Sequence, residues 1–496
     1  MVSDMQSLYE ELKDRINSLD VKIEADDTVR KPAGDYCLCA LAQTDAQARR
    51  AYKEEPVMTG RTEFQRDRER IVNSTAFRRM VDKAQIFSAE KGDYFRTRMT
   101  HTLEVNQIAK AIAYALHLNL DLTEAIALGH DLGHTPFGHQ GERTLNDILS
   151  GKIDAGIVTD KKKMEERCYG GFKHNYQSAR ILTQLENKYV DFSGLNVSTQ
   201  VVEGVLKHTK LKKDIRIEDF VSPEYLEKIY IDENEERQPI ASLEGQVVAI
   251  ADEIAQRGHD VDDALTSGVM TVSEFIDRLK IDKCDELREL IEKEIEKTET
   301  ANRLLPNKQD MQVARIVHRI IRYFISDVIN NSKEKIESST KTSIDDLNKE
   351  TFINFSEKGE KVNKYMEKIV QKKVICNYEV ARADYNAEVV VKTLFQKYYE
   401  NPRLLHTGTL QKIFHDTLMH KNTAVSNSAV CLNDCSVSLA NAEIEEMALK
   451  PLELPNDTKA QKTIRLEKRK ILIRNIVDFI AGMTDGYALQ EYEKIK

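Results

Sequence analysis

The chain has 496 residues and a formal charge of −9, from 73 lysines and arginines against 82 aspartates and glutamates. Its 41% hydrophobic content argues against a disordered chain, and no run of roughly 18 to 20 apolar residues marks it as a membrane protein. With 20 glycines and 9 prolines, well below average usage of about 7% and 5%, the composition predicts long helices rather than many short strands.

The first 60 residues are predicted to form an appended arm, because no periodic pattern there is long enough for a domain. From Arg61 the apolar residues recur at helical spacing, with charged residues between them. Helices are expected over 61–83, 101–118 and 122–134, and the last of these ends at the glycine- and proline-containing loop GHTPFGHQG.

After a predicted loop at 151–170, further helices are expected at 174–186, 241–265 and 312–329. The charged, aperiodic segment 210–239 is predicted to be an insertion, and the polar stretch 332–345 to be a linker. More helices follow, ending in RNIVDFIAGMTDGYALQEY. The sequence therefore predicts an all-α protein with an arm at 1–60, a helical core at 61–300 and a carboxyl-terminal helical region at 301–496 that packs on the core.

The seven cysteines form an odd number, and the amino-terminal stretch has no basic segment followed by an apolar core. Both features predict a reduced, cytoplasmic location. Cys37 with Cys39, and Cys431 with Cys435, each lack a second pair at the spacing of a zinc site, so small buried thiols are the favoured interpretation.

Histidines gather in one part of the chain. Seven of the twelve lie between residues 101 and 208, at His101, His117, His130, His134, His139, His174 and His208. The His130-Asp131 pair ends one apolar helix, His101 begins another, and Asp252 lies in the middle of the apolar helix VVAIADEIA. A carboxylate in such a place is costly to bury unless a cation compensates it. Two imidazoles and two carboxylates suit one divalent ion such as Mn, Fe, Mg, Co or Ni.

The loop after this pair holds a second group of residues. Gly133, Gly138 and Gly141 allow the backbone to run close to a ligand, and His139 and Glu142 are three residues apart where a new helix begins. A carboxylate at that spacing can orient an imidazole, so that its other nitrogen faces a water or a leaving group. A capping or purely structural role for Glu142 is the alternative.

The stretch from Arg61 to Arg98 is basic, with ten lysines and arginines against six acidic residues, a local charge of +4. Most of these arginines are expected to form surface ion pairs of small value. Arg98 differs because it precedes His101 by three residues, where a guanidinium would meet phosphate oxygens.

Six segments, in this order, resemble the bacterial dGTPase-like branch of the HD-domain superfamily: RTEFQRDRERIVNSTAFRRMVDKAQIF, RTRMTHTLEVNQIAKAIA, ALGHDLGHTPFGHQGE, GGFKHNYQSARIL, ADEIAQRGHDVDD and IAGMTDGYA. The resemblance runs from about residue 61 to 263, resumes weakly near 380–405 and returns near the carboxyl terminus. It does not cover residues 1–60 or 300–375.

This resemblance implies an all-helical bundle with an HD catalytic core at 61–300, and a metal-dependent triphosphohydrolase that releases a deoxynucleoside and intact tripolyphosphate from a dNTP. By the same resemblance His101, His130, Asp131 and Asp252 are the metal ligands, and His139 and Glu142 are the catalytic pair. The implied substrate contacts are His134 near the α-phosphate, Arg98 on the phosphates, and Gln85 and Asp260 on the sugar 3′-hydroxyl.

The chain departs from the family pattern at two positions. Many relatives have tyrosine four residues after the last metal-binding aspartate, where this chain has Gln256, so the resemblance does not extend to sugar discrimination. Glu253 stands where some relatives offer a cationic side chain, so contacts to the β- and γ-phosphates must come from elsewhere. The resemblance also implies a homo-oligomer of four or six subunits, with substrate or effector sites near its interfaces.

Three alternatives to a dNTP triphosphohydrolase, acting on dGTP or broadly on dNTPs, stay open. One is an HD phosphohydrolase acting on another nucleotide, such as a nucleoside monophosphate or an alarmone. Another is a nucleotide- or DNA-sensing regulator with an inactive HD site, which the intact set of candidate residues disfavours. Binding of single-stranded DNA by the basic stretch is a further hypothesis.

Overall fold

The computed structural model describes residues 37–54, 60–84, 96–157, 169–231, 239–281, 283–300, 307–339, 350–370, 378–421, 448 and 458–496. The helices described below belong to Leu38–Lys496, one of the two units into which the chain divides. The predicted all-α class is confirmed. Within the described residues the only β-structure is two isolated bridges, Ala84 with Thr97 and Asn187 with Gly194.

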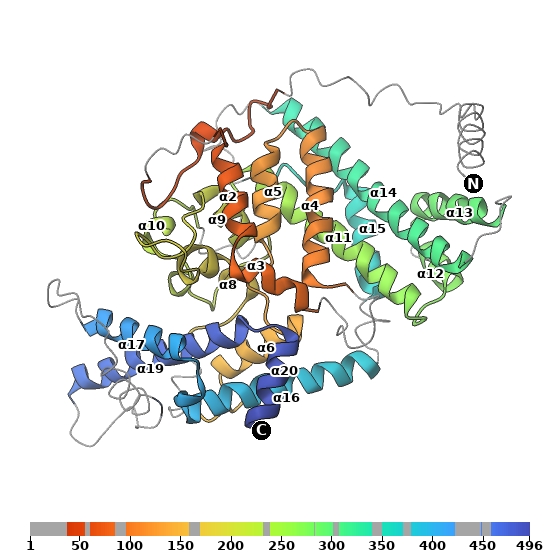
Figure 1. The fold of residues 1–496 in the computed structure, drawn as a ribbon. Coiled ribbons are helices and arrows are strands. Elements are labelled where there is room, and N and C mark those ends of the chain that lie inside the picture. The colour runs from red at the N-terminus through yellow and green to blue at the C-terminus, as the bar shows by residue number, and fades with distance from the viewer. Residues whose placement is uncertain are drawn as a thin grey trace, which may run out of the picture. The chain divides into compact units, whose positions relative to one another are not determined.

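One group of helices surrounds the long helix α11 (Figure 1). Its members are α2 (Glu63–Val72), α3 (Thr75–Arg79), α4 (Arg98–Ala115), α5 (Leu120–Gly129), α8 (His174–Arg180), α9 (Thr199–Lys207), α10 (Pro223–Leu226), α11 (Leu243–Thr266), α12 (Val272–Ile281), α13 (Asp285–Glu299), α14 (Lys308–Ser338) and α15 (Glu357–Val370). Because α11 contacts α4, α5, α9 and α14, it is buried on most sides.

A second group carries its own apolar cluster, which we call the carboxyl-terminal cluster. It contains α6 (Gly138–Leu149), α16 (Tyr378–Glu400), α17 (Thr407–Lys421), α19 (Lys459–Ala481) and α20 (Asp485–Ile495). The first cluster extends from Leu41 to Val380, so α14 and α15 pack with the helices around α11. The predicted boundary between a core at 61–300 and a carboxyl-terminal region at 301–496 stays a prediction. The buried apolar residues form two clusters, and the first of them includes residues on both sides of residue 300.

Polar side chains at the helix starts explain several of the observed boundaries. Thr62 caps α2 by accepting a hydrogen bond from the backbone of Gln65, and Asn119 caps α5 in the same way. Ser242 caps α11 and Thr484 caps α20. Such caps satisfy amide groups that the first turn leaves without helical partners.

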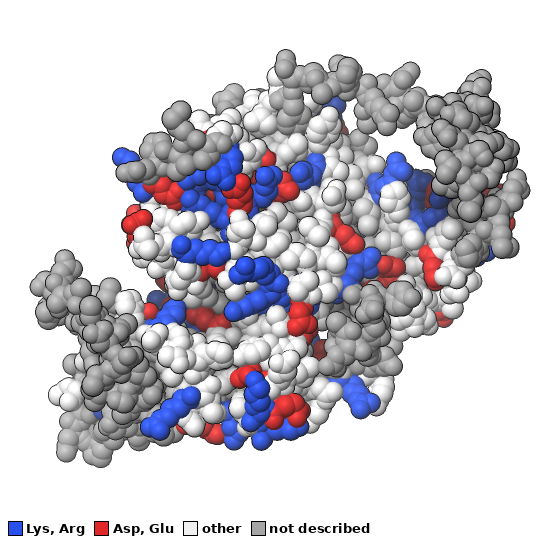
Figure 2. Space-filling model, viewed as in Figure 1, with Lys and Arg blue, Asp and Glu red and all other residues white. Residues whose placement is uncertain are grey.

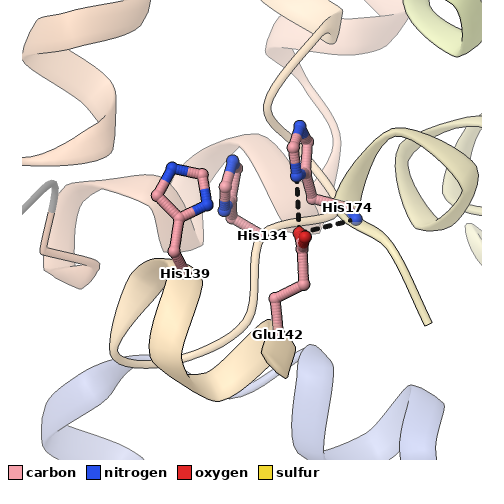
Figure 3. Close-up of side chains that lie close together, drawn as sticks. All are labelled: His134, His139, Glu142 and His174. Atoms are coloured by element: carbon pink, nitrogen blue, oxygen red, sulfur yellow. Dashed lines mark hydrogen bonds and ion pairs between the residues drawn. The ribbon is translucent and has the colours of Figure 1, made fainter. Parts of the chain in front are cut away.

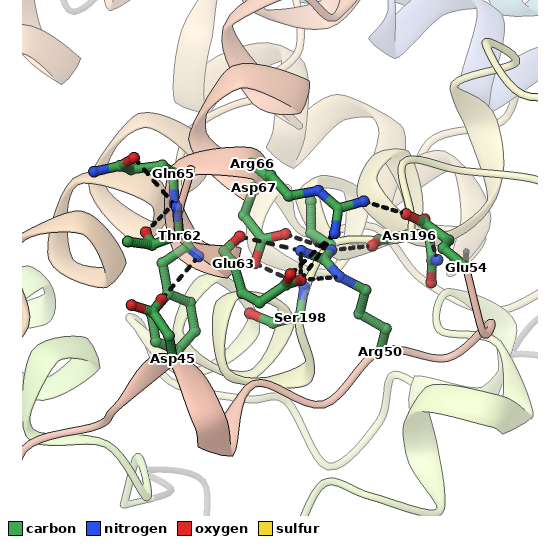
Figure 4. A network of polar contacts seen from close by, with 12 residues as sticks. Asp45, Arg50, Glu54, Thr62, Glu63, Gln65, Arg66, Asp67, Asn196 and Ser198 are labelled. Carbon is green, nitrogen blue, oxygen red and sulfur yellow. Dashed lines mark hydrogen bonds and ion pairs between the residues drawn. The ribbon is translucent and has the colours of Figure 1, made fainter. Parts of the chain in front are cut away.

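Residues 38–54 pack on the helical core through a network of charges (Figure 4). The guanidinium of Arg50 donates to Asp67 at 2.6 Å and to Glu63 at 3.0 Å, and Glu54 accepts from Arg66 and Arg70 at 2.6 Å. Leu41 and Ala42 are buried in the first apolar cluster. This part of the predicted arm therefore contributes to the fold of the core.

Acidic and basic side chains lie interleaved over α2 on the face shown in Figure 2. Among the described basic residues of the stretch 61–98, six have carboxylate partners, namely Arg61, Arg66, Arg68, Arg70, Arg96 and Arg98. No helix within the described ranges combines the length and the apolar character that crossing a membrane would require.

Candidate metal centre and active site

Four predicted metal ligands meet at one point, although they come from three helical segments. His101 lies in the first turn of α4, His130 and Asp131 follow α5, and Asp252 lies in α11. Nε2 of His101 is 3.0 Å from Oδ1 of Asp252, and Nε2 of His130 is 3.8 Å from the same oxygen. Asp131 closes the group, with oxygens 3.6 Å from Nε2 of His130 and 3.8 Å from Nε2 of His101.

The hydrogen bonds of His130 show that this group fits a cation. Nδ1 of His130 donates to the carbonyl oxygen of Ala127 at 2.7 Å, so in the neutral ring the lone pair lies on Nε2. That Nε2 is buried and has no hydrogen-bond partner among the described residues. Burial alone would raise the pKa of Asp131, but His134, His130 and Arg98 hold it well below its usual range. A free imidazole nitrogen and an ionised carboxylate are donors for a divalent ion.

Arg98 lies against the same cluster. One of its terminal nitrogens donates to Oδ2 of Asp131 at 2.9 Å and is 3.1 Å from Nε2 of His134. Nε and the other terminal nitrogen are buried and have no partner in the described part of the chain. Because unpaired buried donors are costly, these N–H groups are placed for an anionic ligand.

A left-handed turn carries the chain from this cluster into α6. Phe137 has φ = 61°, and a side chain at Gly141 would place its Cβ 2.1 Å from the carbonyl oxygen of Pro136. The glycine predicted to allow close backbone approach is therefore required by packing within the loop itself. The turn sets His139 and Glu142 on the first turns of α6.

Glu142 is hydrogen-bonded to His174 (Figure 3), and ligand atoms of His134, His139, Glu142 and His174 all lie within 4.8 Å of one another. Oε2 of Glu142 accepts from Nδ1 of His174 at 2.5 Å and from its backbone N–H at 3.0 Å. The physical reason is that His174 begins α8, where the amide groups lack helical partners and favour a carboxylate. His134 lies between His139 and His174, with its ring stacked on His174 at a centroid distance of 4.0 Å.

Three histidines in the site had no role assigned from the sequence, namely His174, His208 and His259. His208 is buried, and its ring lies 5.3 Å from that of His130. His259 is also buried, with Nδ1 3.3 Å from Nδ1 of His101. In the sequence, only the clustering of histidines between residues 101 and 208 pointed to His174 and His208. His259 lies outside that range.

A pocket of about 460 Å³ adjoins the cluster at Asp252. Its lining is rich in cationic residues, namely Lys173, Lys207, Lys210, Lys212 and Arg257. His208 and Gln256 also line it. Glu253 and Glu367 also line the pocket, and Lys207 is paired with Glu203 at 2.7 Å.

Of the two remaining predicted substrate contacts, Asp260 and Gln85, only Asp260 lies within the described residues. Asp260 is buried in α11, 3.6 Å from Arg257, and burial raises its pKa to about 7. Gln85 lies outside the described residues, so its predicted contact with a sugar stays a prediction.

Comparison with known proteins places this site in a family. A protein of Bartonella tribocorum named deoxyguanosinetriphosphate triphosphohydrolase-like protein is 34% identical over 89% of this chain and 91% of its own length. The chain belongs to the deoxyguanosinetriphosphate triphosphohydrolase-like family. Proteins of the same name from Brucella ovis and Geobacter metallireducens are 32% and 31% identical, each over 92% of this chain and 94% of their own length.

Two family models match parts of this chain. Residues 98–257 match the HD domain and contain all four candidate metal ligands. Residues 444–494 match the phosphohydrolase-associated domain, which takes in all of α19 and nearly all of α20. The chain is thus an HD phosphohydrolase by family, and its His/Asp cluster could hold a metal ion.

Proposed function

We propose that this chain is a metal-dependent dNTP triphosphohydrolase, which converts dGTP, or dNTPs broadly, into a deoxynucleoside and tripolyphosphate. The observation that carries the proposal is the placement of cationic groups on both sides of the candidate metal centre. Arg98 offers buried N–H groups beside Asp131, and the lysine-lined pocket begins at Asp252. A phosphoryl group held at the centre would meet Arg98, and the phosphates that follow it would meet the lysines.

In this proposal His101, His130, Asp131 and Asp252 hold one divalent ion, for which Mn, Mg, Fe, Co and Ni are suited. When bound, such an ion supplies positive charge to phosphoryl oxygens and lowers the pKa of a water molecule. The protein side chains themselves orient the substrate and transfer protons. Arg98 donates to the α-phosphoryl oxygens, and His134 lies 3.1 Å from its guanidinium.

His139 is the proposed proton donor at the leaving 5′-oxygen, or the acceptor at the attacking water. Its side chain is exposed at the start of α6, and its ring lies 5.2 Å from that of His134. Burial alone would raise the pKa of Glu142, but His174 holds it well below its usual range. We therefore propose that Glu142 acts through His174, whose ring it fixes against His134.

The sugar contacts are proposed at Gln85 and Asp260, and Gln256 takes the place of the tyrosine that many relatives have there. A chain without that aromatic ring is expected to discriminate less against a ribose 2′-hydroxyl. The proposed assembly is a cytoplasmic homo-oligomer of four or six subunits, which light scattering of the purified chain would test.

The proposed reaction is tested by its products. The full-length protein would be incubated with each dNTP and NTP in the presence of Mn²⁺ or Mg²⁺, and the products separated by anion-exchange chromatography. Nucleoside with tripolyphosphate supports the proposal. Orthophosphate or pyrophosphate would assign the site to another HD phosphohydrolase reaction, and binding without turnover would favour a nucleotide-sensing regulator.

Two variants assign the residues. Asp131→Ala is expected to abolish metal binding and turnover while the helical circular dichroism spectrum stays close to that of the wild type. His139→Ala is expected to lower kcat at least 100-fold with little change in nucleotide affinity, as removal of a general acid or base does. An equal loss of both quantities would instead make His139 a binding residue.

A further inference from the structure

Helix α8 holds the turn that carries two of the candidate metal ligands. Because α5 ends at Gly129, the backbone from His130 to Gly133 lies outside any helix. The Ser178 hydroxyl of α8 donates to the carbonyl oxygen of His130 at 2.8 Å and accepts from the backbone N–H of Gly133 at 2.8 Å. One buried hydroxyl therefore fixes the backbone on both sides of Asp131.

The same helix meets this turn through close backbone contact. A Cβ atom at Gly133 would lie 2.2 Å from the backbone nitrogen of Ser178 and 2.3 Å from the carbonyl oxygen of His174, so glycine is required there. At its first residue α8 carries His174, which is hydrogen-bonded to Glu142 and stacked on His134. A shift of α8 would therefore move the turn and the ring of His174 together, because closely packed interiors transmit such a displacement.

Asp478 of α19 holds α8 from the carboxyl-terminal group of helices. Its Oδ2 accepts from a terminal nitrogen of Arg180 at 2.9 Å, and its Oδ1 accepts from Nε of Arg180 at 3.1 Å and from Nε2 of Gln177 at 3.0 Å. The side chains of Arg180 and Asp478 are each 8% exposed. Burial alone would raise the pKa of Asp478, but the Arg180 guanidinium holds it below its usual range. The carboxylate thus stays charged and forms a bidentate pair of fixed geometry.

A second residue of α19 holds the segment that enters α8. Arg474, one turn before Asp478, donates to the carbonyl oxygen of Gly171 at 3.2 Å. Gly171 lies three residues before α8 begins at His174. Helix α19 lies within the region 444–494 and α8 within the region 98–257, so the two family regions of the chain meet at these contacts.

We propose that Asp478 is a positioning residue for the candidate metal centre, because through α8 it fixes the ring of His174 and the turn that follows α5. This inference rests on the proposed ion at that centre. Groups that orient metal ligands from behind contribute about 10- to 100-fold in metal affinity or activity. The phosphohydrolase-associated region would thereby support the reaction through a role that requires no contact with the ion or the substrate.

Titration calorimetry of the metal-stripped, full-length protein with Mn²⁺ tests the proposal without any measurement of turnover, at a temperature where every variant is folded. Ser178→Ala is expected to weaken Mn²⁺ binding roughly 10- to 100-fold. Asp478→Asn, which keeps one oxygen acceptor but loses the charge, is expected to weaken it roughly 10-fold. Because both residues act through α8, the loss in the double variant should be smaller than the product of the two single losses. Two losses that multiply in full would overturn the role of α8 as the link.

Asp67→Asn is the matched control, because Asp67 is likewise a buried aspartate paired with an arginine, Arg50 at 2.6 Å, and also accepts from the backbone N–H of Ser198. It should lower the melting temperature about as much as Asp478→Asn does, and leave the Mn²⁺ affinity of the folded protein unchanged. Wild-type affinity in Asp478→Asn would overturn the positioning role, as would an equal loss of affinity in Asp67→Asn.

The same measurements separate this inference from the proposed function. Failure of the wild type to bind Mn²⁺ would overturn the proposed metal centre itself. Mn²⁺ binding with the expected losses in the variants, together with orthophosphate as the product, would support the positioning role of Asp478 and overturn only the proposed reaction.

Discussion

His101 has a hydrogen-bonded chain behind it that leads away from the candidate metal. If Nε2 of His101 binds the ion, its Nδ1 carries the hydrogen, and the group facing it is Nδ1 of His259 at 3.3 Å. His259 must then accept through Nδ1 and donate through Nε2, which contacts the carboxylate of Glu104. The resulting order of carboxylate, imidazole, imidazole and metal would fix the ring of His101 and strengthen it as a donor.

Replacing His259 with phenylalanine is expected to weaken Mn²⁺ binding roughly 10- to 100-fold, the usual cost of losing a partner behind a metal-bound histidine. Titration calorimetry of the metal-free protein would measure the affinity. Glu104→Gln serves as a milder companion, because its amide oxygen can still accept from Nε2 of His259. Unchanged affinity in His259→Phe would mean that His101 needs no such support.

For single residues, the sequence predicts a site role best where the neighbouring residues along the chain already indicate burial. His130 and Asp131 end an apolar helix, and Asp252 interrupts another, so their cost of burial could be argued before the fold was known. The contact of Glu142 with His174 joins residues 32 positions apart and depends on where α8 begins. No local pattern contains that information, and the same holds for His101 and His259.

Among the helices, α20 holds the loop that leads to His139. Asp485, its first residue, accepts from the backbone N–H of Phe137 at 2.8 Å through Oδ1 and from that of Ala84 at 2.9 Å through Oδ2. Nearby, Nζ of Lys83 donates to the carbonyl oxygens of His134 and Ala481. The left-handed conformation of Phe137 is thus held from the carboxyl-terminal cluster.

Asp485→Ala is expected to destabilise the fold by about 1–3 kcal/mol for each buried amide group left without a partner, and to lower kcat more than it raises KM. Steady-state kinetics and thermal unfolding of the same sample would separate the two effects. Glu493→Ala is the control, because Glu493 is exposed on the same helix. A proportional loss of activity and folded fraction would reduce Asp485 to a purely structural residue.

Two expectations about elements show where composition misleads. The charged segment 210–239 was expected to be an insertion, yet its described part buries Phe220 and Tyr225, and the Tyr225 hydroxyl donates to the carbonyl oxygen of Val197 at 2.9 Å. The polar stretch 332–345 was expected to be a linker, yet α14 continues to Ser338 with Ser332 buried. In both places tertiary packing prevails over local propensity.

At the scale of the whole molecule, several arginines in the described part of the basic stretch 61–98 form ion pairs with carboxylates from other parts of the fold. Arg66 and Arg70 pair with Glu54, Arg68 with Glu124, and Arg96 with Asp262, all partners from outside the stretch. The charge of +4 counted over residues 61–98 could not include these partners, because they lie elsewhere in the sequence. Binding of single-stranded DNA there stays a hypothesis, and salt-dependent titration with an oligonucleotide would test it.

Glu244 couples the stability of the whole fold to pH. It is fully buried in α11, and its Oε1 accepts from the backbone N–H of Gln43 at 3.0 Å and of Asn119 at 2.9 Å. Its Oε2 is buried without a partner among the described residues. Burial raises the pKa of Glu244 to about 7, although the two amide groups oppose the rise. The carboxyl group thus holds a proton in the folded chain over a pH range where the unfolded chain has lost it.

Because the pKa of Glu244 is higher in the folded state, its contribution to stability is fully present below about pH 4.5 and is lost as pH rises to about 7. The loss amounts to roughly 3 kcal/mol, at about 1.4 kcal/mol for each pH unit of the shift. Glu244→Gln keeps an oxygen for both amide groups and cannot ionise. The variant is therefore expected to match the wild type near pH 4.5 and to exceed its free energy of unfolding above pH 7, as measured by urea denaturation. Glu227→Gln, at an exposed position, should show no such divergence, and a constant difference between Glu244→Gln and the wild type across this range would disprove the coupling.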